Sequence, residues 1–161
     1  RASIGAEVKN SVLQLTSNYY KKIDDGTEFE KVLDGYDVQL TSQVPYLHWA
    51  NVFTSTYKWY GEKRDDIEGR KYGSELFLTP SLNLEIAYDD KRIKGFKDEY
   101  YARLFYVYPP RTTSPTLLTH GLSSRLWNEE KDMSGELLTK VKRQNKIMVE
   151  SSGSVTVSRL D

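Results

Sequence analysis

The stretch Leu82-Asn83-Leu84-Glu85-Ile86-Ala87-Tyr88-Asp89 decides the fold class of this sequence. Its even-numbered positions are all apolar or aromatic, and its odd-numbered positions are polar except for Ala87. Successive side chains of a β-strand point to opposite faces, whereas a helix would scatter these residues around its axis. The stretch therefore predicts a strand with one apolar face.

The same period of two recurs from Ala2 to Pro109. It predicts about seven strands, most of them about eight to twelve residues long, whereas ordinary globular strands average about five or six. A strand that crosses a bilayer at a tilt needs about 9–11 residues. The expected strands cover residues 4–8, 12–20, 36–44, 50–60, 72–79, 82–89 and 99–108.

Two kinds of connection alternate between these strands. Short turns are expected around residues 9–10, 45–49 and 80–81, and long charged loops at 24–34, 61–70 and 89–98. Outer-membrane barrels have short periplasmic turns, longer extracellular loops and aromatic residues at both membrane interfaces. These patterns favour an all-β fold, an antiparallel transmembrane β-barrel, with the long loops outside the cell.

The alternation also assigns side chains to the two faces of this barrel. The residues expected to face lipid are Leu40, Phe53, Leu76, Leu84 and Leu104. The residues expected to face the lumen are Asp37, Gln39, Thr54, Glu75, Glu85, Glu99 and Arg103. The aromatic residues expected at the membrane interfaces are Tyr19, Tyr36, Trp49, Trp59, Tyr72, Tyr88, Tyr100 and Tyr108.

The period changes after Pro110, which divides the chain into barrel strands at residues 1–110 and a tail at residues 111–161. Residues 111–132 have no sustained pattern and are expected to form an irregular connection. A short helix is expected at 134–145 and an extended segment at 147–161. The basic residues of this part are either a solvated helix face or a plug drawn into an acidic lumen; they are Lys140, Lys142, Arg143 and Lys146.

Composition limits the other classes of function. The 161 residues carry 23 Lys and Arg against 23 Asp and Glu, so there is no cationic excess for a nucleic-acid partner. Without Cys there is no disulfide framework and no Cys-ligated metal site. The acid pairs 65–66, 89–90 and 129–130 lie in charged loops, and we expect neither an enzyme nor a cofactor or metal site. A soluble β-sandwich binding module remains the alternative to the barrel.

Several blocks of the sequence resemble the barrel of the intimin/invasin family, the inverse autotransporters. The blocks are Gly35–Leu40, Val44–Leu47 and Tyr57–Gly61, then Leu78–Leu84 with Ala87-Tyr88, and finally Met133–Gly135 with Val141–Glu150. They are similar to the family's glycine–aromatic–aspartate strand, proline turn, aromatic strand and threonine–proline hairpin, and to the segment after its last strand.

This resemblance implies a barrel of the bacterial outer membrane that exports and displays an adhesive passenger. Its partners would be outer-membrane lipid, the barrel-assembly machinery, periplasmic chaperones and its own passenger, which would bind a host or surface receptor. The family's barrel has about twelve strands, so we expect the sequence to be the C-terminal part of a larger barrel. The tail would then return through the lumen, with residues 146–159 running outward as an extended strand.

Overall fold

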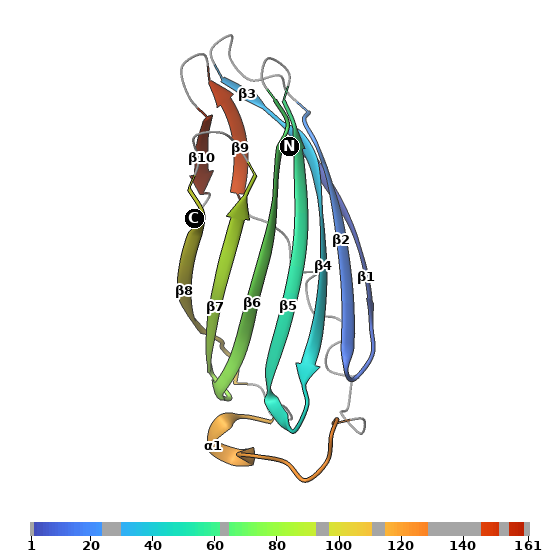
Figure 1. The fold of residues 1–161 in the computed structure, drawn as a ribbon, viewed down its shortest axis with the longest axis vertical. Helices are drawn as coiled ribbons and strands as arrows, with labels where there is room; N and C mark the ends of the chain where they lie inside the picture. Colours follow the sequence, from blue (N-terminus) through green and yellow to red (C-terminus); the bar gives the residue numbers. More distant parts are fainter. Residues whose placement is uncertain are drawn as a thin grey trace.

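A computed structural model of the chain describes residues 2–23, 30–61, 65–92, 97–110, 115–128, 146–151 and 155–159. Seven strands form one antiparallel sheet, in which each strand pairs with the strands before and after it in the order β1-β2-β4-β5-β6-β7-β8 (Figure 1). These strands are β1 (Ala2–Lys9), β2 (Leu13–Lys21), β4 (Asp34–Val44), β5 (Leu47–Tyr60), β6 (Ile67–Thr79), β7 (Leu82–Lys91) and β8 (Glu99–Tyr106). The predicted all-β, antiparallel fold is therefore confirmed.

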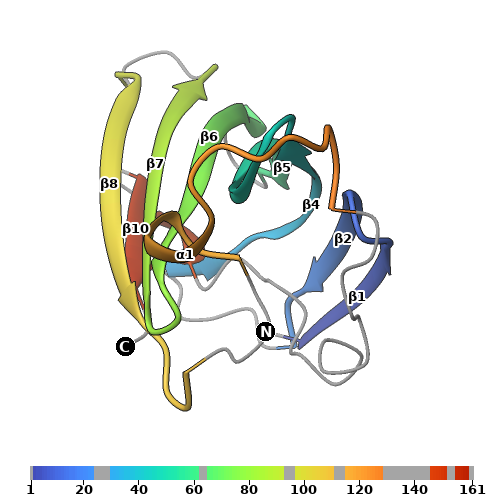
Figure 2. The ribbon, with the colours of Figure 1, turned by 90° about the horizontal axis from the view of Figure 1, so that it is seen from below.

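The large sheet is strongly curved. Seen from below, its strands stand around an open arc from β1 to β8 (Figure 2). Within the described residues these strands make one sheet rather than the two packed sheets of a sandwich. The curvature therefore gives the wall of a barrel, with an inner and an outer face.

A second, three-stranded sheet joins the tail to the connection between β2 and β4. Its order is β10-β9-β3, where β3 is Glu30–Val32, β9 is Lys146–Ser151 and β10 is Val155–Arg159. The antiparallel pairing of β9 with β10 means that the chain reverses between residues 151 and 155. The prediction of one outward strand over residues 146–159 is therefore wrong, because pairing within a hairpin satisfies backbone groups that a single strand leaves open.

Two strands extend further into the charged segments than the sequence predicted. β6 already begins at Ile67 and β7 continues to Lys91. The register places Lys71 opposite Asp89 and Arg70 opposite Asp90. Opposite charges facing each other across strands stabilise a sheet, so these residues lengthen the wall instead of forming a loop.

The short turns lie at one end of the wall, together with the end of β8 (Figure 1). In the β1–β2 turn, the Asn10 side-chain oxygen accepts hydrogen bonds from the Val12 and Leu13 N–H groups. The β4–β5 turn is Pro45-Tyr46, and Tyr46 has a φ of 62°. We call this end the short-turn end and the opposite one the long-loop end.

The connection predicted to be irregular at 111–132 contains the one-turn helix α1 (Leu117–His120). Thr116 and Thr119 form a capping box that holds this turn, and such paired hydrogen bonds can stabilise a turn without an amphipathic pattern. The helix predicted at 134–145 lies outside the described residues. Among the described residues, no helix is long and apolar enough to span a membrane.

Burial in the wall is the reverse of that in a soluble protein. Apolar side chains are widely exposed on the outer face, with Ile4 73% and Leu104 62% exposed. The inner face buries polar side chains, with Asn18 1% and Asp37 5% exposed. Lys, Glu and Asp are almost never buried in soluble proteins unless paired, whereas a membrane barrel has an apolar outside and a polar inside.

Strand β5 departs from this rule, because its inner face carries three aromatic residues. Phe53, Tyr57 and Trp59 are buried there, and each lies directly opposite a glycine of a neighbouring strand. The pairs are Phe53 with Gly73, Tyr57 with Gly69, and Trp59 with Gly35. A Cβ atom at these glycines would lie 2.5 Å from Phe53 Cζ, 2.3 Å from Tyr57 Oη and 2.4 Å from Trp59 Cε3. The rings therefore occupy space that only a glycine leaves open.

We predict that Gly35→Ala destabilises the wall by about 1–3 kcal/mol, the usual cost of overpacking a filled site. The new methyl group would meet both the Trp59 ring and the Lys58 carbonyl oxygen at 2.5 Å, and a backbone oxygen cannot swing away. Reversible unfolding in lipid bilayers, followed by tryptophan fluorescence, measures the change. Ser74→Ala, on the outer face of β6, is the control and should have little effect. An equal effect of the two substitutions would contradict the glycine–aromatic packing.

Candidate functional site

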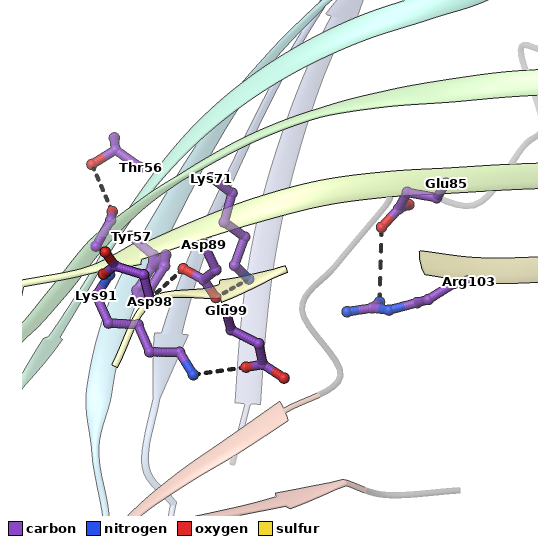
Figure 3. A network of polar contacts seen from close by, with 10 residues as sticks. Thr56, Tyr57, Lys71, Glu85, Asp89, Lys91, Asp98, Glu99 and Arg103 are labelled. Carbon is purple, nitrogen blue, oxygen red and sulfur yellow. Dashed lines mark hydrogen bonds and ion pairs between the residues drawn. The ribbon is translucent and has the colours of Figure 1, made fainter. Parts of the chain in front are cut away.

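The inner face of the wall is lined by a polar network that runs across β5, β6 and β7 (Figure 3). The Tyr57 hydroxyl donates a hydrogen bond of 2.9 Å to one carboxylate oxygen of Asp89. The Lys71 ammonium lies 3.9 Å from the other oxygen and 5.0 Å from the centre of the Tyr57 ring. Burying a charge is costly unless a partner is present. The three side chains satisfy one another and fix a charged surface on the inside.

Two further ion pairs continue the network toward β8. Lys91 lies 2.8 Å from Glu99, and Arg103 lies 4.0 Å from Glu85 (Figure 3). The Arg103 guanidinium also lies 4.2 Å from the centre of the Tyr101 ring. Each of these two cations is thus paired with an acid of the neighbouring strand.

Asp37 has a different environment on β4. The Asn18 side-chain amide donates a hydrogen bond of 3.0 Å to one of its carboxylate oxygens, Oδ2. The other oxygen, Oδ1, is buried and has no hydrogen-bond partner among the residues that the structure describes. A buried carboxylate oxygen that lacks a donor costs free energy. Among the described residues, Asp37 thus keeps one carboxylate oxygen without a donor.

The structure places most of the predicted lumen residues on the inner face. Glu75, Glu85 and Arg103 stand opposite one another across β6, β7 and β8. Gln39 faces Thr16 and Ser55, both of which are buried. Asp37 and Glu99 share this face with them, through the contacts to Asn18 and Lys91 given above.

Thr54 and Phe53 are exchanged relative to the prediction. Thr54 is exposed and lies opposite Leu40 and Tyr72 on the outer face, and Phe53 is buried inside. The assignment of Thr54 to the lumen and Phe53 to lipid is therefore wrong. Its physical cause is the glycine at position 73, which makes room for the Phe53 ring on the inside.

The predicted interface aromatics also divide into two groups. Those exposed on the outer face are Tyr19, Tyr72 and Tyr100, while Tyr108 is exposed just beyond β8. Tyr36 lies in register with Tyr19, and Tyr88 with Tyr72 and Tyr100, so both share the outer face. Trp59 is 0% exposed and packs inside against Tyr20, with ring centres 5.2 Å apart. Its prediction as an interface residue is wrong, for the same reason as that of Phe53.

Three of the acids considered as catalytic groups have structural partners, namely Asp66, Asp89 and Asp90. Asp66 lies 2.9 Å from the Lys58 ammonium and accepts a hydrogen bond from the Gly61 N–H. These hydrogen bonds, the one from Lys58 above all, hold the pKa of Asp66 below its usual range. Asp89 bonds Tyr57, and Asp90 lies 3.8 Å from Arg92. Residues 129–130 lie outside the described residues.

The tail contacts the wall at the short-turn end and again at the long-loop end. At the short-turn end, residues 121–128 are hydrogen-bonded to the β4–β5 turn, and Pro115 lines a pocket of about 50 Å³ with Gln43, His48 and Asn51. At the long-loop end, β9 pairs with β3, for example Val149 with Val32. Neither contact was predicted, because on the tail's side both are made by backbone groups.

A family model for the inverse autotransporter β-domain matches residues 1–145. The chain belongs to the inverse autotransporter β-domain family. The β-domain of this family is an outer-membrane barrel with a translocator role. A comparison with curated proteins gave no match.

A solved structure from work on the in-meso crystallisation of membrane proteins has the same fold, with a TM-score of 0.66 at 17% identity. The alignment covers 92% of this chain and 66% of that one. The chain thus spans just under two thirds of the length of the related structure.

The corrected faces of the β-domain can be tested at neighbouring positions of β5. Because the chain has no Cys, Thr54→Cys and Ser55→Cys each give a single site for a nitroxide spin label. We predict that the label at position 54 collides with oxygen, which dissolves in lipid, and that the label at 55 does not. Electron paramagnetic resonance relaxation measures both. The reverse result would restore the original assignment of β5.

Proposed function

We propose that this β-domain anchors an intimin/invasin-like protein in the outer membrane and passes its own tail outward through the lumen to display an adhesive passenger. One observation carries the proposal. The tail is bound at the short-turn end at residues 121–128, and its residues 149–151 pair with β3, in the wall's β2–β4 connection, at the long-loop end. The chain between these two points would therefore have to pass from one end of the wall to the other.

The route between the two ends is limited by the need of backbone groups for hydrogen-bond partners. A bilayer core offers no water to unpaired backbone groups, each of which costs several kcal/mol there. The polar inner face offers charged partners for a crossing segment. A ten-residue strand such as β7 is only about 34 Å long, and an extended chain covers about 3.3–3.6 Å per residue, so the length of residues 129–145 suffices.

The basic residues of the tail would then face acidic groups of the wall. Lys140, Lys142 and Arg143 lie outside the described residues, and Lys146 begins β9. Of the expected partners, Glu85 and Glu99 already have Arg103 and Lys91. We therefore propose Asp37 as the main acceptor for a cation of the tail, because its buried Oδ1 has no hydrogen-bond partner among the described residues.

Orientation and partners follow from this role. The long-loop end, with β3 and β9, would lie outside the cell and the short-turn end in the periplasm. β1 and β8 each pair on one side only within the described part of the chain, so further strands would have to close the barrel. The barrel-assembly machinery and periplasmic chaperones would insert it, and the passenger would bind a host or surface receptor.

The pairing of β3 with β9 provides a direct test of this route. Val32 and Val149 are register partners, so we predict that Val32→Cys with Val149→Cys forms a disulfide in the full-length protein in intact cells. The control is Val32→Cys with Val157→Cys, because Val157 lies one strand further away, opposite Met148. Non-reducing gel mobility and mass spectrometry detect the bond. Equal cross-linking in both pairs, or none in either, would contradict a tail that reaches the long-loop end.

Passenger display is measured separately, by surface labelling of cells. Deletion of residues 134–161 with the passenger retained should abolish display if the tail is the route. Unchanged display would remove the tail from the mechanism.

A further inference from the structure

The β4–β5 turn binds the tail through its own backbone. The Tyr46 N–H donates a hydrogen bond of 3.0 Å to the Leu126 carbonyl, and the Tyr46 carbonyl accepts one of 2.8 Å from the Ser123 N–H. Both backbone groups of one turn residue are therefore used by a segment far away in the sequence. This is how one strand recognises another, although here it occurs at a turn.

Three side chains beside the turn add bonds to the same segment. The Trp49 indole N–H donates to the Gly121 carbonyl at 2.8 Å, and the His48 Nε2–H donates to the Arg125 carbonyl at 3.0 Å. The Gln43 side-chain oxygen accepts a hydrogen bond of 2.9 Å from the Asn128 N–H. Every one of these bonds goes to the backbone of the tail, so the contact specifies the path of the tail and not its side chains.

The conformation of Tyr46 fits this purpose. Its φ of 62° lies in the left-handed region, which L-residues rarely adopt and which a turn with Pro at its second position normally gives to Gly or Asn. Such backbone strain persists where surrounding contacts determine it. The two hydrogen bonds to residues 123 and 126 are contacts of this kind.

We propose that the β4–β5 turn is a docking site for residues 121–128, which holds the base of the tail at the short-turn mouth. A tail tied at this point cannot be drawn through the lumen by its outer end, so the crossing segment keeps one fixed starting position. The purpose of the docking rests on the proposed function, but the docking itself does not.

Trypsin cleavage after Arg125 tests the docking. The Arg125 side chain is exposed, but its carbonyl is bonded to His48 and the next carbonyl to Tyr46. A protease needs the segment to open, and the cleavage rate then follows the open population. In the full-length protein in detergent micelles, His48→Phe with Trp49→Phe should raise this rate about 30-fold, or about fivefold for each lost hydrogen bond. Mass spectrometry of the fragments gives the rate, with cleavage after the exposed Lys97 as the internal reference.

The matched control is Tyr106→Phe with Tyr108→Phe, which removes polar groups at the same mouth, from residues 73% and 82% exposed. It should leave cleavage after Arg125 unchanged. Gln43→Leu, a second variant, should raise the rate by itself, and the altered gel mobility of an unheated barrel shows that each variant is folded. Equal rates in the parent and the double variant, or an equal rise in the control, would overturn the docking site. Protection of the Arg125 bond in the parent, together with unchanged passenger display after deletion of residues 134–161, would refute the proposed function and leave the docking site standing.

Discussion

The structure depends on one constraint, which is that backbone N–H and C=O groups inside a bilayer have no water to bond with. Each strand must therefore pair with its neighbours along its whole length, as β2, β4, β5, β6 and β7 do on both sides. Pairing forces the side chains to alternate between lipid and lumen. The exposed apolar outer face and the buried polar inner face follow from this alternation. The same need for pairing means that β1 and β8 require partners beyond their one described neighbour.

The alternation of side chains was enough to predict most of this wall from the sequence. Leu84 and Glu85 illustrate why, because a period of two is a local property that needs no knowledge of the other strands. Phe53 and Trp59 are the exceptions, because alternation within one strand does not decide their side. Their side is decided by Gly73 and Gly35 on neighbouring strands, and this pairing depends on register. The spacing of glycines and aromatics on adjacent strands is the signal that would have found it.

The tail was predicted less well than the wall, also for a physical reason. Its contacts with Tyr46 and with β3 are made by backbone groups, which every residue except proline carries in full. Side-chain patterns therefore say little about them. The Thr116–Thr119 capping box of α1 was detectable in principle, but a single turn has no period to recognise. What the sequence did indicate is the change of period after Pro110 that separates the tail from the wall.

Inner charges and outer apolar residues together match the wall of a membrane barrel, which is apolar outside and polar inside. The most direct measurement of that claim compares Leu84→Arg with Glu85→Arg, two neighbours on opposite faces of β7. Unfolding free energies in lipid bilayers should fall by about 2–4 kcal/mol for Leu84→Arg, because the charge enters hydrocarbon, and by clearly less for Glu85→Arg, because it enters a polar lumen. Equal losses at the two positions would contradict the account.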